Sequence, residues 1–153
     1  MTCRGAYVCL PLMPPRSLAA CALTPFMAMC GFRAAAEVAE HLQSVPELRA
    51  AVGNEAADAF IATAGSGDAT ASKSALRKAF AALMHADAPC VASQTTALAS
   101  RLAVSPLPAS ATHPDAVARM LCAQYPGDIG VFAPYLLNTI EVRSGVRRHS
   151  GAD

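Results

Sequence analysis

Ser72–His85 reads Ser-Lys-Ser-Ala-Leu-Arg-Lys-Ala-Phe-Ala-Ala-Leu-Met-His, and it carries the clearest periodicity in the chain. Its large apolar residues recur three and four positions apart, while Lys78 falls opposite them and Arg77 at their edge. This spacing predicts an amphipathic helix with one buried face. The residues expected on that face are Leu76, Phe80, Leu83 and Met84.

The same helical spacing continues on both sides of this segment. Asn54 could cap the helix before it, which ends at the breaker Gly65-Ser66-Gly67, and the loop 105–108 separates the two helices after it. A proline at a first helical position starts one short helix. The sequence therefore predicts a mainly α fold, a small helical bundle, with helices at 33–43, from 46, after 54, at 72–85, 88–104 and 114–125.

The two ends of the chain lack this periodicity. Residues 1–21 show neither a helical nor an alternating pattern and carry three of the eleven prolines, so we expect them to be irregular or poorly ordered. Near the other end, Thr139–Arg143 is a short β-prone segment.

Composition limits the partners. A formal net charge of +1 leaves no surplus for phosphodiester backbones or anionic lipids, so we expect neither nucleic acid nor a membrane as a partner. The six cysteines form no C-x-x-C pair and are expected to be reduced thiols in the cytosol. The uncharged run Ser17–Phe32 resembles a signal peptide, but Pro25 interrupts it and it is shorter than the ~20 residues of a spanning helix.

Reactive constellations are missing from the sequence. The histidines His41, His85, His113 and His149 are too scattered for a paired metal motif, and no nucleophile elbow is present. Gly67–Ser74 approaches a phosphate-loop pattern, but Ser72 replaces its second glycine and a helix precedes it. We therefore expect no catalytic, metal-binding or substrate-binding residue in this chain.

The most specific string is Gln124–Phe132, Gln-Tyr-Pro-Gly-Asp-Ile-Gly-Val-Phe, followed by Leu136-Leu137-Asn138. By itself it predicts a helix stop, a Pro-Gly turn, an acidic cap and an apolar helix that ends at the asparagine. As a whole it resembles the signature of type I mannose-6-phosphate isomerases. Other strings that resemble this family, in the same order, are Ala22–Phe26, Cys30–Arg33, Val45-Pro46-Glu47 and Gly53–Ala57.

The resemblance, which covers Ala22–Gly145, implies the helical insertion domain of a cupin-type isomerase. That family binds zinc and interconverts mannose 6-phosphate and fructose 6-phosphate, a cytoplasmic step that supplies GDP-mannose. The family's zinc ligands fall outside this chain or on Leu18, which cannot bind a metal. The implied division is a divergent start (1–21), a cupin edge (22–32), the helical insertion (33–125), a return segment (126–145) and a divergent tail (146–153).

Three functional interpretations follow. In the first interpretation, the chain is a fragment or misassembled gene model of such an isomerase, inactive alone and separated from its cupin domain. Alternatively, it is a freestanding helical interaction module that uses the apolar surface such a domain would cover. The third is a small exported helical protein.

Overall fold

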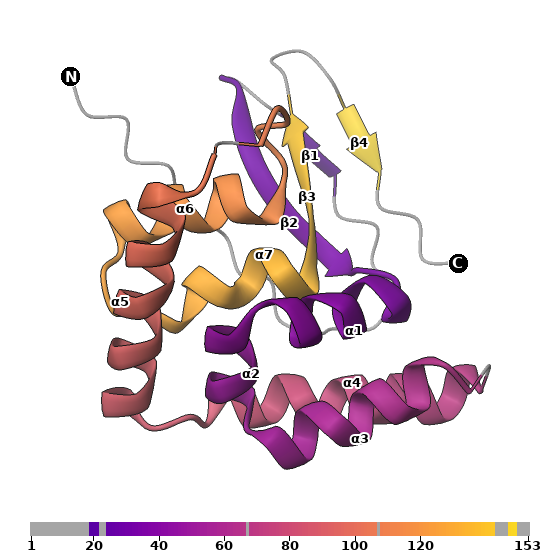
Figure 1. Cartoon of the computed structure of the whole chain (residues 1–153). Helices are drawn as coiled ribbons and strands as arrows, with labels where there is room; N and C mark the ends of the chain where they lie inside the picture. Colours follow the sequence, from indigo (N-terminus) through magenta and orange to yellow (C-terminus); the bar gives the residue numbers. More distant parts are fainter. Residues whose placement is uncertain (1–18, 22–23, 67, 107, 143–146, 150–153) are drawn as a thin grey trace.

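The computed structural model describes residues 19–21, 24–66, 68–106, 108–142 and 147–149 (Figure 1). Its helices lie beside and below two small pairs of strands in this view, which confirms the predicted mainly α class with short strands toward the ends. The helices are α1 (Ala35–Ser44), α2 (Pro46–Val52), α3 (Asn54–Ala64), α4 (Ala69–Met84), α5 (Ala88–Val104), α6 (Pro114–Gln124), the 3-10 helix η1 (Ile129–Phe132) and α7 (Ala133–Leu136). The strands are β1 (Ala19–Cys21), β2 (Phe26–Phe32), β3 (Leu137–Val142) and β4 (Arg147–His149).

Local side-chain chemistry explains where several helices begin. Asp68 caps α4 by accepting hydrogen bonds from the backbone N–H groups of Thr70 (2.9 Å) and Ala71 (3.0 Å). This part of the stretch that resembles a phosphate loop is thus an ordinary helix start that follows another helix. The prediction that Asn54 caps α3 is wrong, because its side-chain oxygen accepts from Arg49 instead and Gly53 (φ 87°) takes the cap position.

The prediction for the buried face of α4 is confirmed for Leu76 and Leu83, while Phe80 is half-buried against the core. Leu76, Ala79 and Leu83 are buried, whereas Met84 is 42% exposed. Met84 follows Leu83 by one residue, a rotation of about 100° around the helix, so it turns toward solvent. A small residue, Ala79, occupies the inner position and lets the helices approach closely.

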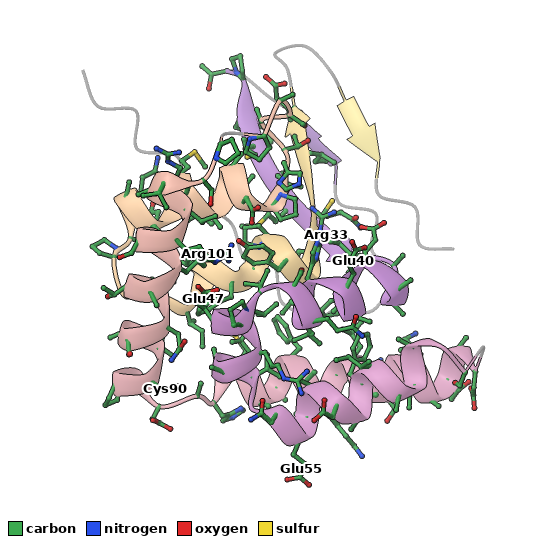
Figure 2. All side chains as sticks on the ribbon, viewed as in Figure 1. Arg33, Glu40, Glu47, Glu55, Cys90 and Arg101 are labelled. Atoms are coloured by element: carbon green, nitrogen blue, oxygen red, sulfur yellow. The ribbon has the colours of Figure 1, made fainter. Side chains whose placement is uncertain are left out.

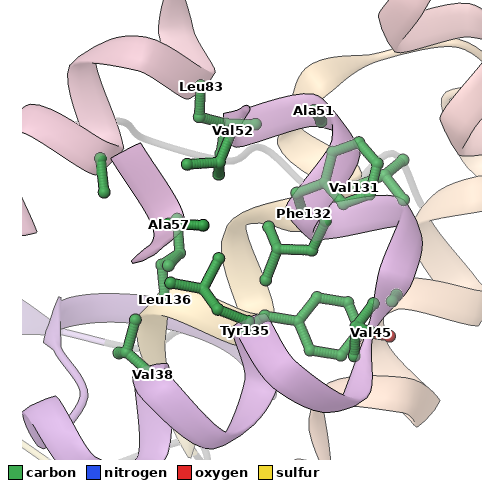
Figure 3. Packing of buried hydrophobic residues seen from close by; sticks show 14 of the residues in the cluster. Val38, Val45, Ala51, Val52, Ala57, Leu83, Val131, Phe132, Tyr135 and Leu136 are labelled. Atoms are coloured by element: carbon green, nitrogen blue, oxygen red, sulfur yellow. The ribbon is translucent and has the colours of Figure 1, made fainter. Parts of the chain in front are cut away.

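The core lies where α7 and η1 meet the other helices. Figure 3 shows Phe132, Tyr135 and Leu136 packed near Val38 of α1 and Val45, the residue that joins α1 to α2. Phe132 is fully buried, and Tyr135 and Leu136 are each 1% exposed. The two shortest helical elements therefore supply some of the largest buried side chains of the molecule.

The prediction that the apolar run 129–137 forms one helix is wrong. It contains η1, capped by Asp128 through the N–H of Gly130 (2.6 Å), then α7, and the backbone becomes extended at Leu137. Leu137 already belongs to β3, because it pairs with Phe32 of β2. Pairing with a distant strand thus ends this helix at Leu136, one residue before the end of the apolar run.

The described residues form two antiparallel strand pairs. β2 pairs with β3 from Phe26↔Val142 to Phe32↔Leu137, with an irregularity between Met29 and Phe32, where Gly31 has φ 68°. We call this pair the ribbon. β1 pairs with β4. The segment expected to be irregular at 1–21 therefore includes a strand at its end, and residues 1–18 lie outside the described residues.

The described part of the uncharged run that resembles a signal peptide contains β2 rather than a helix. No helix among the described residues has the length and apolar character needed to cross a membrane.

Candidate functional site

A polar cluster joins four helices, and its members are Glu47 of α2, Arg101 of α5, Asp115 of α6 and Tyr135 of α7. Arg101 donates from Nε and Nη2 to the two carboxylate oxygens of Glu47 at 2.9 and 3.0 Å. Figure 2 shows these two side chains beside one another where α5 meets α2. Only 8% of the Glu47 side chain is exposed, against 36% of the Arg101 side chain, so the carboxylate of this two-pronged ion pair is largely removed from water.

Tyr135 forms the second half of the cluster. Its hydroxyl donates to Asp115 Oδ1 at 2.7 Å, and the residue is almost completely buried. Burial, together with this hydrogen bond, raises the pKa of Tyr135 far above its ordinary value. The hydrogen bonds that Arg101 donates to Glu47 likewise raise the pKa of Arg101. Both residues therefore keep their protons throughout the physiological range.

The contacts of the cluster join pairs of helices. Its two acids accept hydrogen bonds from a guanidinium and a phenol, and burial keeps the phenol protonated. Its effect is to tie α2 to α5 and α6 to α7 through polar contacts of defined geometry.

A second polar arrangement lies where the chain passes between the ribbon and the helices. The carbonyl oxygens of Pro134, Tyr135 and Leu136 accept, in order, from Arg33 Nε (2.9 Å), His41 Nδ1 (2.8 Å) and the backbone N–H of Arg33 (2.9 Å). A carbonyl oxygen can only accept, so Nδ1 of His41 carries the hydrogen. We call this arrangement the crossing.

The histidines that the structure describes are used in local contacts. His41 belongs to the crossing, His85 donates from Nδ1 to the carbonyl of Ala81 (2.7 Å), and His113 caps α6 by accepting from the N–H of Asp115 (3.2 Å). The side chain of His149 lies outside the described residues, as does Leu18.

These contacts bear on zinc binding. No group of three or more His, Cys, Asp or Glu side chains among the described residues is placed to hold a metal ion. The cysteines Cys30, Cys90 and Cys122 are free thiols on separate elements. The described residues therefore do not fit the four-ligand shell of a protein zinc site.

A wide, open groove runs along α3 and α4, with a volume of about 730 Å³. Small side chains such as Ala56, Ala59 and Ala75 line much of it, and Glu55 and Lys78 are its charged members. Its other polar lining residues are Asn54, Thr63 and Ser74.

Most residues of the ribbon are exposed or half-buried. Among the described strands β2 and β3 pair only with one another, so each has an outer edge without a partner strand. Phe26 and Phe32 at the two ends of β2 are both 37% exposed. The ring of Phe32 meets Phe80 of α4 edge to face at 5.4 Å, which packs this end of the ribbon against the helices.

Comparison with known proteins identifies the family. Residues 51–137, more than half of the chain, match the family described as "Phosphomannose isomerase type I, helical insertion domain". The chain therefore belongs to this family, as the motif strings predicted.

Individual similar proteins carry names that agree with this family. The chain is 39% identical over 129 residues to "Mannose-6-phosphate isomerase" of Macaca fascicularis and 37% identical over 129 residues to that of Homo sapiens. It is 31% identical over 134 residues to "Mannose-6-phosphate isomerase 1" of Arabidopsis thaliana. These matches cover 82–88% of this chain but only 30–31% of the relatives, so the chain corresponds to a part of such proteins.

Sequence reasoning missed both polar arrangements. Arg33 and Asn138 occur in the strings that carry the family resemblance, yet nothing in their spacing assigned them a role. A usable signal was the presence of polar side chains at both junctions between a β-prone and a helical segment. The expectation that this chain carries no catalytic or ligand-binding residue stays a prediction.

Proposed function

We propose that this chain is the helical region of a mannose-6-phosphate isomerase, and that the complete protein interconverts mannose 6-phosphate and fructose 6-phosphate with zinc. The observation that carries the proposal is the ribbon. It brings together the two ends of a helical region that matches this family's insertion domain.

An insertion between two strands of a larger sheet must begin and end at neighbouring positions. Phe32 pairs with Leu137, and the next residue inward on each side is joined by the bond from the N–H of Arg33 to the carbonyl of Leu136. The outer edges of β2 and β3 and the exposed ring of Phe26 are features that folded proteins usually cover. They suit a β-domain that continues this ribbon.

The side chains indicate which functions belong to the helical insertion and which to the cupin domain. We assign the helical insertion to 33–125 and the return to 126–145, with 22–32 as the edge of the cupin domain, between divergent residues 1–21 and 146–153. The zinc ligands and the sugar-phosphate contacts would come from the cupin domain, because the described histidines of this chain make local contacts and no three described ligand side chains are grouped to hold a metal ion. This chain by itself is then inactive, and the free thiols suit the cytoplasm.

A graft tests the proposal. Residues 26–142 replace the matching segment of the Macaca fascicularis relative, and conversion of mannose 6-phosphate is measured with zinc present. We expect kcat/KM within about tenfold of the parent, a change in barrier of about 1.4 kcal/mol. A matched graft that carries Phe132→Asp, which places a charge in the core, should be inactive. A folded, zinc-loaded graft of the unaltered segment without isomerase activity would refute the proposal.

A further inference from the structure

The C-terminal end of α7 is capped by residues that lie far from it in the sequence. The last carbonyl groups of a helix have no partner within the helix and carry partial negative charge. Here three consecutive carbonyls, those of Pro134, Tyr135 and Leu136, are satisfied by Arg33 and His41, about a hundred positions earlier in the chain. Arg33 also places a guanidinium at this helix end, where positive charge is favoured.

The guanidinium of Arg33 is itself oriented. Its Nη1 donates to Glu37 at 3.2 Å while its Nε donates to Pro134, and only 14% of the side chain is exposed. A fixed, planar donor of this kind specifies direction as well as proximity.

Asn138 adds a contact on the strand side of the crossing. Its Nδ2 donates to the carbonyl oxygen of Phe32 at 2.9 Å. This bond lies beside the irregularity between Met29 and Phe32, where the regular pairing of the two strands is interrupted. The side chain thus joins β2 to β3 where the backbone ladder is irregular.

Tyr135 extends these contacts into the helices. Its ring meets the ring of His41 edge to face at 5.6 Å, its carbonyl accepts from that histidine, and its hydroxyl reaches Asp115 of α6. The contacts therefore run without a break from the ribbon through α7 to α6.

We propose that Arg33, His41 and Asn138 are positioning residues that hold the ribbon in one fixed orientation on the helical region. Both connections between the two parts are short, because two residues separate β2 from α1 and none separates α7 from β3. Short connections limit separation but still permit bending, and directed hydrogen bonds on both sides of the junction remove that freedom. The inference goes beyond the proposed isomerase function, and it holds whether or not the protein has that activity.

Residual dipolar couplings of backbone amides in the ¹⁵N-labelled full chain test the proposal, because they report relative orientation. The test variant is Arg33→Met with Asn138→Ala. The control is Arg49→Met, which removes another arginine hydrogen-bonded to an asparagine and an acid, Asn54 and Asp58, away from the crossing. We expect one alignment tensor for ribbon and helices in the wild type and the control, and clearly smaller ribbon couplings in the test variant.

Amide hydrogen exchange supplies a local measure. Protection of the Arg33 amide, which donates to Leu136, should fall at least about tenfold in the test variant, while Leu98 inside α5 stays as protected as before. Undiminished ribbon couplings would overturn the proposal. Equal loss of protection in ribbon and helices would also overturn it, because that result would mean a general contribution to stability.

A single substitution covers the case in which the double variant fails to fold. Asn138→Ala removes only an exposed side chain, so folding should be retained. Its ribbon couplings should fall by less than those expected for the double variant, and unchanged couplings would contradict the proposal. None of these measurements uses zinc or a sugar phosphate, so their failure is distinct from failure of the proposed function.

Discussion

The hydroxyl of Tyr135 in α7 donates a 2.7 Å hydrogen bond to the carboxylate of Asp115 in the first turn of α6. The backbone carbonyl oxygen of the same tyrosine accepts a hydrogen bond from His41 of α1. One buried residue therefore links the helix beside the ribbon to two others. Its contributions can be separated, because its side chain and its backbone contact different elements.

Tyr135→Phe removes the hydroxyl and leaves the ring. Asp115 then loses its phenolic donor in a half-buried position, and we expect the free energy of unfolding to fall by about 1–3 kcal/mol. Urea unfolding followed by circular dichroism measures the change. A variant as stable as the wild type would show that this hydrogen bond contributes nothing net.

Because the pKa of Tyr135 is raised in the folded protein, the free energy of unfolding should decrease at alkaline pH. Above about pH 10 an unfolded tyrosine loses its proton while the folded one keeps it, so the unfolded state is favoured. The contribution is complete below pH 10 and falls by up to ~1.4 kcal/mol per pH unit above it. The difference in unfolding free energy between wild type and Tyr135→Phe should therefore shrink above pH 10, and a constant difference would contradict the assignment.

Breaking the Glu47–Arg101 pair should cost more than breaking an exposed pair. Arg101→Met leaves the buried Glu47 carboxylate without its partner, and we expect a loss of about 1–3 kcal/mol. This is below the ~3–5 kcal/mol of a fully buried pair, because 36% of the Arg101 side chain is exposed. The matched control Arg49→Met, whose partner Asp58 is 61% exposed, should cost less than ~1 kcal/mol. Equal losses in thermal unfolding would contradict this ranking.

The core and surface assignments near the ends of helices are tested by two truncations. Phe132→Ala opens a cavity at a fully buried site and should destabilise the chain by about 3–5 kcal/mol. Met84→Ala, on the half-exposed end of α4, should change stability by no more than about 0.5 kcal/mol. A large loss for Met84→Ala would mean that a partner or another element covers this residue.

The helices could be predicted because their signal is local. Apolar spacing and breakers predicted α4 and α5 closely, and Pro114 marks the start of α6. The end of α7 was mispredicted because it depends on Leu137 pairing with Phe32, and no local pattern specifies that register.

The polar arrangements could not be predicted for the same reason. Glu47 looks like an ordinary acidic residue in a first helical turn, and its burial depends on Arg101, 54 positions later. The contact between Arg33 and Pro134 spans 101 positions. The motif strings marked some of these residues through family resemblance, but the interactions themselves needed the three-dimensional structure.

We propose that this chain is the helical region of a larger isomerase. The most direct test is the size and activity of the native polypeptide, isolated from a cell extract with an antibody against Ser72–His85. We predict a product several times heavier than 15.7 kDa with zinc-dependent mannose-6-phosphate isomerase activity. A native product of 15.7 kDa without that activity would contradict the account.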